Sequence, residues 1–140
     1  MSRLNVDLVQ EKKWKLEHLE IKDEAKAIEA VRRRGNAYAL NAQGVLIALS
    51  MTAKDIDSLI LGEECHDLEH LYLGYNEKLT QIEFETNLPK LQYLYLNNCA
   101  LNGTLRLPEG FANLKQVYVQ KNQLQGLVFE GDCPELELLD

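Results

Sequence analysis

The sequence predicts an α/β solenoid, and three observations lead to this fold class. Apolar residues recur every 22 or 23 residues from Leu46 to the C-terminus. No unit of this length can bury its own apolar residues, so neighbouring units must share a core. The first 45 residues do not repeat and carry a helical pattern instead. At 140 residues the chain suits one compact domain or one short repeat array, and we expect one folding unit.

Every repeat carries apolar residues at the same six positions. The first three are separated by three residues and then by two, a spacing that suits a short strand entered from a bend. The last two alternate with exposed residues and point toward the shared interior. Four units are complete, and a fifth begins at Leu136 and Leu139. The four sets are Leu46, Leu49, Met51, Ile56, Leu59 and Leu61; Leu68, Leu71, Leu73, Leu79, Ile82 and Phe84; Leu91, Leu94, Leu96, Leu101, Leu105 and Leu107; and Leu114, Val117, Val119, Leu124, Leu127 and Phe129.

The motif L-x-x-L-x-L-x-x-N-x-L is visible in Leu68 to Asn76, Leu91 to Leu101 and Leu114 to Leu124. Over roughly two-thirds of the chain the sequence thereby resembles the leucine-rich repeat family. The resemblance implies a right-handed superhelix with a parallel concave sheet, and this chain as the N-terminal part of a longer array. It also implies that Asn or Cys at the motif's asparagine position satisfies backbone groups in the loop leaving the strand. That position holds Lys54, Asn76, Cys99 and Asn122, so the first repeat departs from the pattern.

We interpret residues 1–45 as an N-terminal helical cap with a hairpin into the first repeat, and residues 46–140 as the repeats. Four apolar residues fall on one face of a helix, Asp23 is a suitable N-cap and Gly35 a suitable terminator, which predicts a helix over residues 24–34. Residues 38–40 and 45–49 flank a turn over residues 41–44 and predict a hairpin. The four apolar residues are Ile21, Ala25, Ile28 and Val31.

Residues 4–20 fit either a strand or a helix, because Trp14 and Leu16 alternate while Leu8 and Leu19 also suit a helical face. We favour a helix. The whole N-terminal region can be a cap or a separate functional domain. We favour the cap, covering the layer that contains Leu46, Leu49 and Met51, because the first core layer of a solenoid needs a cover with a polar outer side.

Composition excludes several classes of function. A net charge of −7 opposes binding to a phosphate backbone, so we expect no nucleic-acid partner. Arg32, Arg33 and Arg34 are better explained as complements to the negative end of a helix dipole. The longest apolar run is too short to span a bilayer, and no membrane association is expected. Three cysteines without a C-x-x-C pair favour a reducing compartment, the cytoplasm.

The resemblance implies that partners bind to the concave sheet, through the variable positions beside the strand leucines. The position between the second and third leucines holds Ser50, Tyr72, Tyr95 and Tyr118, which predicts a tyrosine ladder across strands about 4.8 Å apart. Two residues earlier lie Ala48, His70, Tyr93 and Gln116. The ladder can serve binding, because tyrosine is frequent among interface hot spots, or can stabilise the sheet by cross-strand packing. We favour binding and predict the contacts Tyr72, Tyr93, Tyr95, Tyr118, His70 and Gln116.

No metal, cofactor or catalytic residue is expected. His66 and His70 are spaced as metal ligands on a helix, but the repeat places His70 on a strand, where the two side chains lie too far apart. Cys65 and Cys133 share a repeat position with Leu88 and Phe111, which predicts that both thiols are buried and unreactive. No catalytic or nucleotide-binding motif occurs.

We therefore expect a non-enzymatic, cytoplasmic module that binds a protein partner on the concave face. The alternative is the N-terminal sensor or regulatory region of a larger signalling protein with a nucleotide-binding domain, and a hydrolase is the weakest candidate. The fifth repeat begins at Pro134 and breaks off at Asp140, which leaves an open strand edge. We expect the natural array to continue there, with a homodimer through this edge as the alternative.

Overall fold

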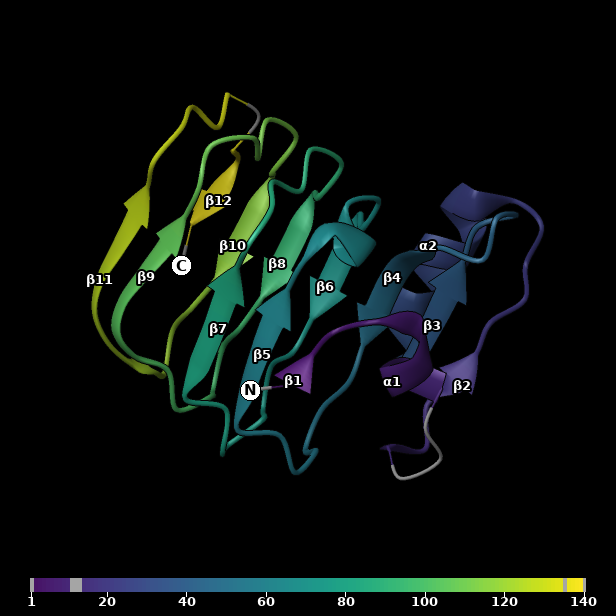
Figure 1. Cartoon of the computed structure of the whole chain (residues 1–140), viewed down its shortest axis with the longest axis horizontal. Helices are drawn as coiled ribbons and strands as arrows, with labels where there is room; N and C mark the ends of the chain where they lie inside the picture. Colours follow the sequence, from purple (N-terminus) through teal and green to yellow (C-terminus); the bar gives the residue numbers. More distant parts are fainter. Residues whose placement is uncertain (1, 11–13, 135, 140) are drawn as a thin grey trace.

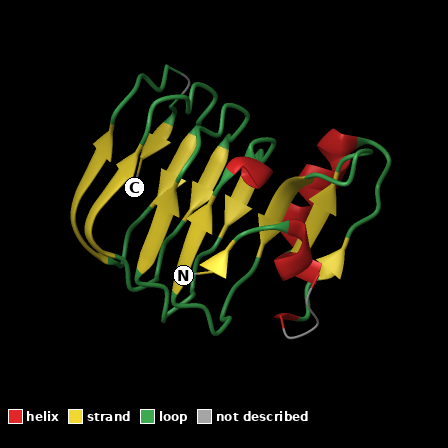
Figure 2. Cartoon of the chain, in the orientation of Figure 1, coloured by secondary structure: helices red, strands yellow, loops and turns green. Residues whose placement is uncertain are grey.

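The computed structural model describes residues 2–10, 14–134 and 136–139 and shows a solenoid-like α/β fold (Figures 1 and 2). Strands dominate, and two α-helices lie near the N-terminus. In chain order the elements are β1 (Ser2–Arg3), α1 (Val6–Gln10), β2 (Glu17–His18), α2 (Glu24–Arg34), β3 (Ala37–Leu40), β4 (Leu46–Ser50), β5 (Ser58–Leu61), η2 (Glu63–Cys65), β6 (His70–Tyr72), β7 (Gln81–Phe84), β8 (Tyr93–Tyr95), β9 (Asn102–Leu107), β10 (Gln116–Tyr118), β11 (Gln123–Phe129) and β12 (Leu138–Leu139).

One long sheet runs through the molecule in the order β12-β10-β8-β6-β4-β3-β2. Its strands are parallel except at the β3–β4 hairpin, which confirms the predicted turn over residues 41–44. The register places Leu49, Leu71, Leu94 and Val117 in one row, so the predicted repeat alignment is confirmed. β12 pairs in parallel with β10 and continues the same row. Of the predicted fifth repeat, residues 135 and 140 lie outside the described residues.

The strand leucines face an interior that is closed on its other side by shorter sheets. β1, β5 and β7 form one parallel sheet, and β9 and β11 form another. Figure 1 shows β5 and β7 in front of the long sheet, with the core between the two layers. The core is continuous from the N-terminal segment to the fourth repeat. No repeat closes by itself, as the sequence pattern predicts.

Polar side chains satisfy the backbone where the chain leaves β6, β8 and β10. The Nδ2 group of buried Asn76 donates to the carbonyl oxygens of Met51 (3.0 Å) and Leu73 (2.6 Å), and its Oδ1 accepts from the Lys54 amide (3.0 Å). Cys99 Sγ donates to the Leu73 carbonyl (3.2 Å) at the equivalent position. The role that the family resemblance implies for this position is confirmed in the structure. The residue before it has positive φ in every repeat, at Ala53, Tyr75, Asn98 and Lys121.

Helix α2 spans residues 24–34, as the sequence predicts. The Asp23 side chain accepts from the Lys26 amide (3.2 Å), and the helix stops at Gly35, where φ is 74°. Burial of Ala27 and Val31 marks the face that packs on the protein. Each terminus of the helix therefore has a specific chemical cause.

Different parts of the N-terminal region pack on the two faces of the long sheet. Leu4, Val9 and Trp14 pack into the main core, which also contains Leu46, Leu49 and Met51. The favoured helix over residues 4–20 is present as α1 (Val6–Gln10) but does not extend to β2. Only α1 is helical before residue 11, and β2 is a strand; residues 11–13 lie outside the described residues. A strand forms at β2 because it gains β3 as a partner.

Helix α2 packs on the opposite face of the long sheet, away from the main core. Ala27 and Val31 form a second, smaller core with Ala39, Ile47 and Ala48. We expected the helix to belong to the cover of the leucine layer. Instead it occupies β3 and β4 on the face where a partner was expected to bind, because these strands present small apolar side chains there.

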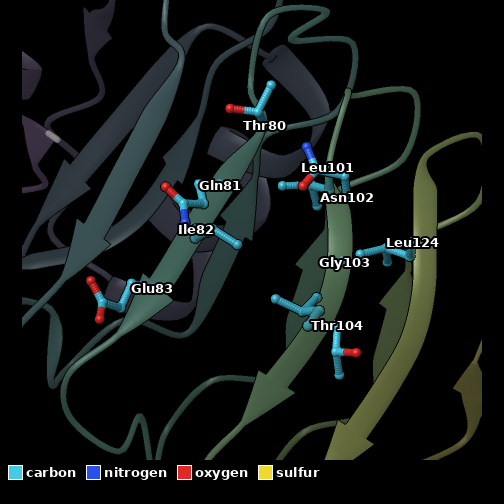
Figure 3. A pocket seen from close by; sticks show the side chains of 10 residues that line it. Thr80, Gln81, Ile82, Glu83, Leu101, Asn102, Gly103, Thr104 and Leu124 are labelled. Carbon is cyan, nitrogen blue, oxygen red and sulfur yellow. The ribbon is translucent and has the colours of Figure 1, made fainter.

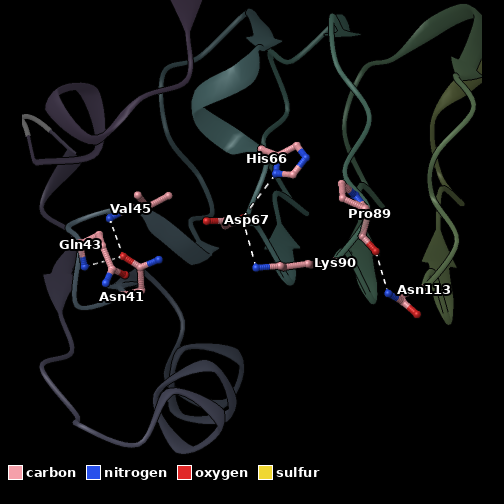
Figure 4. A network of polar contacts seen from close by, with 8 residues as sticks. All are labelled: Asn41, Gln43, Val45, His66, Asp67, Pro89, Lys90 and Asn113. Carbon is pink, nitrogen blue, oxygen red and sulfur yellow. Dashed lines mark hydrogen bonds and ion pairs between the residues drawn. The ribbon is translucent and has the colours of Figure 1, made fainter.

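Surface contacts join equivalent positions of successive repeats (Figure 4). Asp67 pairs with Lys90 (3.2 Å) in the next repeat, and Asn113 donates from Nδ2 to the Pro89 carbonyl oxygen (2.7 Å). Asn41 Oδ1 accepts from two amides of its own turn, which fixes the hairpin. The exposed contacts add little stability individually, and repeat alignment rests on the core.

The thiol prediction is confirmed for Cys65 and corrected for Cys133. Cys65 is buried, as are Leu88 and Phe111 at the same repeat position, and burial raises the pKa of Cys65 to about 12. Cys133 is only half-buried and packs at the margin of the main core.

In the native protein at pH 8, a disulfide-exchange reagent should modify Cys133 well before Cys65, because the Cys65 thiol is buried and almost wholly protonated. Mass spectrometry of the labelled peptides measures both rates. In denaturant the two rates should converge. Equal rates in the native state would contradict the position of Cys65 in the core.

Replacing Asn76 with Ala should lower the free energy of unfolding by about 3 kcal/mol, because the Lys54 amide and two carbonyl groups lose their partner in a buried site. Urea denaturation measures the loss. Asn113→Ala is the matched control: its side chain is exposed and makes one bond, so the loss should stay under about 1 kcal/mol. Equal losses in the two variants would show that the Asn76 bonds do not hold the repeats together.

Candidate functional site

The candidate site lies on the face of the long sheet opposite the main core, which we call the tyrosine face. It carries the side chains at alternate positions of β6, β8 and β10. The register aligns Tyr72, Tyr95 and Tyr118 in one row and His70, Tyr93 and Gln116 in the next, so the structure brings together all six predicted contact residues.

The rings of the tyrosine face pack in tilted and edge-to-face pairs. Tyr95 lies at the centre, with its ring centroid 5.4 Å from that of Tyr72 at 84° and 4.6 Å from that of Tyr118 at 60°. These are favourable geometries for aromatic pairs. The predicted ladder is therefore present, and its ring contacts stabilise the sheet through cross-strand packing.

Exposure divides the six residues into two groups. Tyr72, Tyr93, Gln116 and Tyr118 are half-buried, whereas Tyr95 is 8% exposed and His70 is fully buried. The Tyr95 hydroxyl donates to Gln116 Oε1 at 2.7 Å. Burial also raises the pKa of Tyr95, an effect that the positive charge of Arg32 partly offsets. Tyr95 and His70 form the floor of the site, and we correct the expectation that both lie on its open surface.

His70 is enclosed by the rings of Tyr72, Tyr93 and Tyr95, with centroid distances of 6.4, 6.0 and 5.7 Å. Neither ring nitrogen has a hydrogen-bond partner among the described residues. Burial, together with the nearby charge of Arg32, lowers the pKa of His70 to about 4. The imidazole is therefore neutral near pH 7, and it packs as an aromatic ring.

Helix α2 reaches the tyrosine face through Arg32. The Arg32 Cζ atom lies 4.4 Å from the centroid of the Tyr93 ring, which is a cation–π contact between the last turn of the helix and the third repeat. Arg34, two residues on, pairs instead with Glu17 at 2.8 Å. Arg32 thus does more than complement the helix dipole.

A shallow hollow of about 290 Å³ opens beyond the end of α2. Its lining residues are Tyr72, Tyr95, Asn97, Tyr118 and Gln120. Asn97 has room because the residue beside it in the second repeat is Gly74, where an added Cβ would meet Asn97 Oδ1 at 2.8 Å. The Gln120 Oε1 atom has no hydrogen-bond partner among the described residues.

Sequence reasoning missed three residues of this site. Asn97 and Gln120 follow Tyr95 and Tyr118 by two residues, so extending the alternation of side chains by one step would have found them. Arg32 carried no signal, because only the docking of α2 brings it to the third repeat.

A second hollow, of about 370 Å³, lies between β7 and β9 on the other side of the core (Figure 3). It exists because the two short sheets are separate, with no strand pairing between β7 and β9 in the described residues. Thr80, Gln81 and Asn102 give it a polar lining. Leu101 and Leu105, which are four residues apart where the equivalent residues of the other repeats are three apart, line this hollow.

Other candidate chemistry is sparse among the described residues. His66 lies on the surface beside Asp67 (3.4 Å) while His70 is buried among the tyrosine rings, so the two histidines share no site. No group of three metal-ligating side chains converges in the described part of the chain. No helix there is long and apolar enough to cross a bilayer.

Comparisons with known proteins bear on the repeats. Residues 66–109 match the family model described as Leucine Rich repeats (2 copies). A Roc-COR-CHAT protease of Runella zeae is 51% identical over 98 residues, which make up 70% of this chain and 10% of that protein. A second Roc-COR-CHAT protease, from an unknown prokaryotic organism, is 32% identical over 95 residues. These residues make up 68% of this chain and 9% of that protein. The chain spans about a tenth of the length of these relatives, and no solved structure matches it significantly.

The buried imidazole of His70 should make stability depend on pH. Its folded pKa of about 4 lies below the unfolded value of 6.5, so the unfolded chain binds the proton first and the free energy of unfolding falls as pH drops from 6.5 to about 4. Between pH 7 and pH 5 this contributes a loss of about 2 kcal/mol, which His70→Phe should remove. Urea denaturation at both pH values measures it.

The control for this experiment is His66→Phe, which replaces an exposed histidine. This variant should keep the pH dependence of the parent protein. An unchanged pH dependence in His70→Phe would show that His70 is not a buried neutral group.

Proposed function

Because the chain belongs to the leucine-rich repeat family, we propose that it is a protein-interaction module that binds a protein partner on the tyrosine face, the face that the family pattern expects to be concave. The partner would contact Tyr72, Tyr118 and Gln116 directly. His70 and Tyr95, the buried floor, would hold these side chains in place. Tyr93 would contribute through the ring edge that Arg32 leaves free.

The observation that carries this proposal is a surface of half-buried tyrosine side chains on a rigid sheet. Tyr72, Tyr93 and Tyr118 come from three neighbouring strands, and the second small core, which includes Ala48 of β4, places α2 over the N-terminal strands of the same face. Tyrosine offers large contact area with few rotatable bonds, which lowers the entropy lost on binding. The cross-strand ring contacts reduce that loss further.

The relatives support a second candidate, in which this module is a sensor or regulatory region of a larger signalling protein. Two multidomain proteins named Roc-COR-CHAT protease contain a similar segment that makes up about a tenth of their length. In such a protein, binding of a partner to the tyrosine face would change the state of another domain. The expected nucleotide-binding domain would be the one that responds. The two candidates use the same surface and differ in what binding controls.

We further propose that the chain itself has no catalytic role. Burial raises the pKa of Cys65, Cys99 and Cys133, which keeps all three thiols from acting as ready nucleophiles. The three free thiols support a cytoplasmic location, and the net charge of −7 supports a protein partner over nucleic acid.

A second copy of the chain is a further possible partner within this proposal. β12 has β10 on one side and no partner on its other side within the described residues.

Replacing both Tyr72 and Tyr118 with Ala should weaken binding of a protein partner, captured with the intact chain and then purified, at least 30-fold. Hot-spot tyrosines cost about 2 kcal/mol or more each when truncated. Calorimetric titration measures the affinity, and thermal unfolding checks that the variant is folded.

Tyr75→Ala is the matched control, because Tyr75 is 51% exposed and belongs to the loop after β6. Its affinity should equal that of the parent chain. Tyr95→Ala tests the floor separately and should lower stability, because its ring is buried and its hydroxyl bonds to Gln116. A folded Tyr72→Ala, Tyr118→Ala variant with unchanged affinity would place the partner elsewhere.

A further inference from the structure

The hollow on the tyrosine face has the chemistry of a site for a guanidinium group. We propose that the hollow lined by Tyr72, Tyr95, Asn97, Tyr118 and Gln120 receives an arginine side chain of the protein partner. This inference rests on the proposed function, because it names the partner chemistry that the same face would recognise.

The protein already binds one guanidinium group on this face. Arg32 lies 4.4 Å over the ring of Tyr93, and the Tyr93 and Tyr95 rings are neighbours on β8 with centroids 6.3 Å apart. Cations within about 6 Å of a ring centroid are attracted by the ring face, and the planar guanidinium group also stacks on it. Tyr72 and Tyr118 offer further ring surface beyond the reach of α2.

Hydrogen bonding makes the hollow rich in acceptors. Two of its donor groups are already engaged: the Tyr95 hydroxyl donates to Gln116, and Asn97 Nδ2 donates to Asn98 Oδ1 at 3.1 Å. Among the described residues Gln120 Oε1 is a buried acceptor without a donor, and a turn of its side chain would present this oxygen to a ligand. A guanidinium group has five donors and no acceptor, which matches this set.

Size and charge point to the same ligand. A hollow of about 290 Å³ is slightly smaller than sites for drug-sized molecules, which begin at about 300 Å³, and so suits one side chain. None of its lining residues is charged, and the guanidinium group of Arg32 acts on Tyr95 from the side of α2. The net charge of −7 attracts a basic segment from a distance.

The test uses N-acetyl-L-arginine amide as the probe, titrated into the isotope-labelled chain and followed by amide chemical shifts. Saturable shifts should appear around Tyr95, Asn97 and Gln120. The amide of N-acetyl-citrulline, which has the same shape without the charge, should bind about fivefold more weakly. Blocked leucine should give no saturable shift there.

Two variants and one control connect these shifts to the hollow. Tyr118→Leu removes a ring face, Gln120→Ala removes the unpartnered oxygen, and each should weaken arginine binding about threefold to fivefold. Tyr75→Leu should leave it unchanged. If Tyr118→Leu does not fold, Gln120→Ala decides the result.

Equal binding of arginine and citrulline, or shifts confined to acidic parts of the surface, would overturn the inference. If the Tyr72→Ala, Tyr118→Ala variant loses its protein partner while arginine leaves the hollow unperturbed, the arginine site is wrong and the proposed function stands. If arginine occupies the hollow while that variant keeps its partner, the site stands and the proposed function fails.

Discussion

The structure depends on one constraint: no repeat can bury its own leucines. Leu71 of β6 lies in a row with Leu49 and Leu94 of the neighbouring strands, and these side chains are excluded from solvent only because the next unit covers each of them. Burying each leucine stabilises the fold by about 1.5–3 kcal/mol. This gain is available only when strands align in register, so the apolar interior fixes the sheet and the position of every side chain on its other face.

The tyrosine face is a product of that register. Side chains at alternate positions of a strand point to opposite faces, so a leucine at the centre of β8 places Tyr93 and Tyr95 together on the far side. Parallel neighbours in register then bring Tyr72 and Tyr118 to the same line. The packed leucines fix the strands, and the same strands carry the tyrosines on their other face. The core therefore holds the aromatic surface in place.

The N-terminal region limits how much of this face remains open. β3 and β4 present alanines outward, and α2 packs on them through Ala27 and Val31. On the next strands of the same face, β6, β8 and β10, the outward side chains include tyrosines instead of alanines. Arg32 of α2 contacts Tyr93 where these two regions meet. One sheet face thus serves both helix packing and the proposed binding of a partner. The small side chains lie under the helix, and the large aromatic side chains form the proposed binding surface.

The sequence by itself determined the repeats, the strand register and helix 24–34. Leucine spacing and helix caps are local signals, and each has one satisfactory geometry. It also identified the six residues of the tyrosine face, because alternation along a strand is a property of the backbone. Only the tertiary structure decided which of them are exposed. Whether His70 faces solvent or is buried near Arg32 depends on contacts between distant segments. A local pattern cannot encode the docking of a helix whose Arg32 precedes His70 by 38 residues. The short strands β1 and β2 likewise formed because partners were in reach, since pairing with β5 and β3 supplies the hydrogen bonds that their own residues lack.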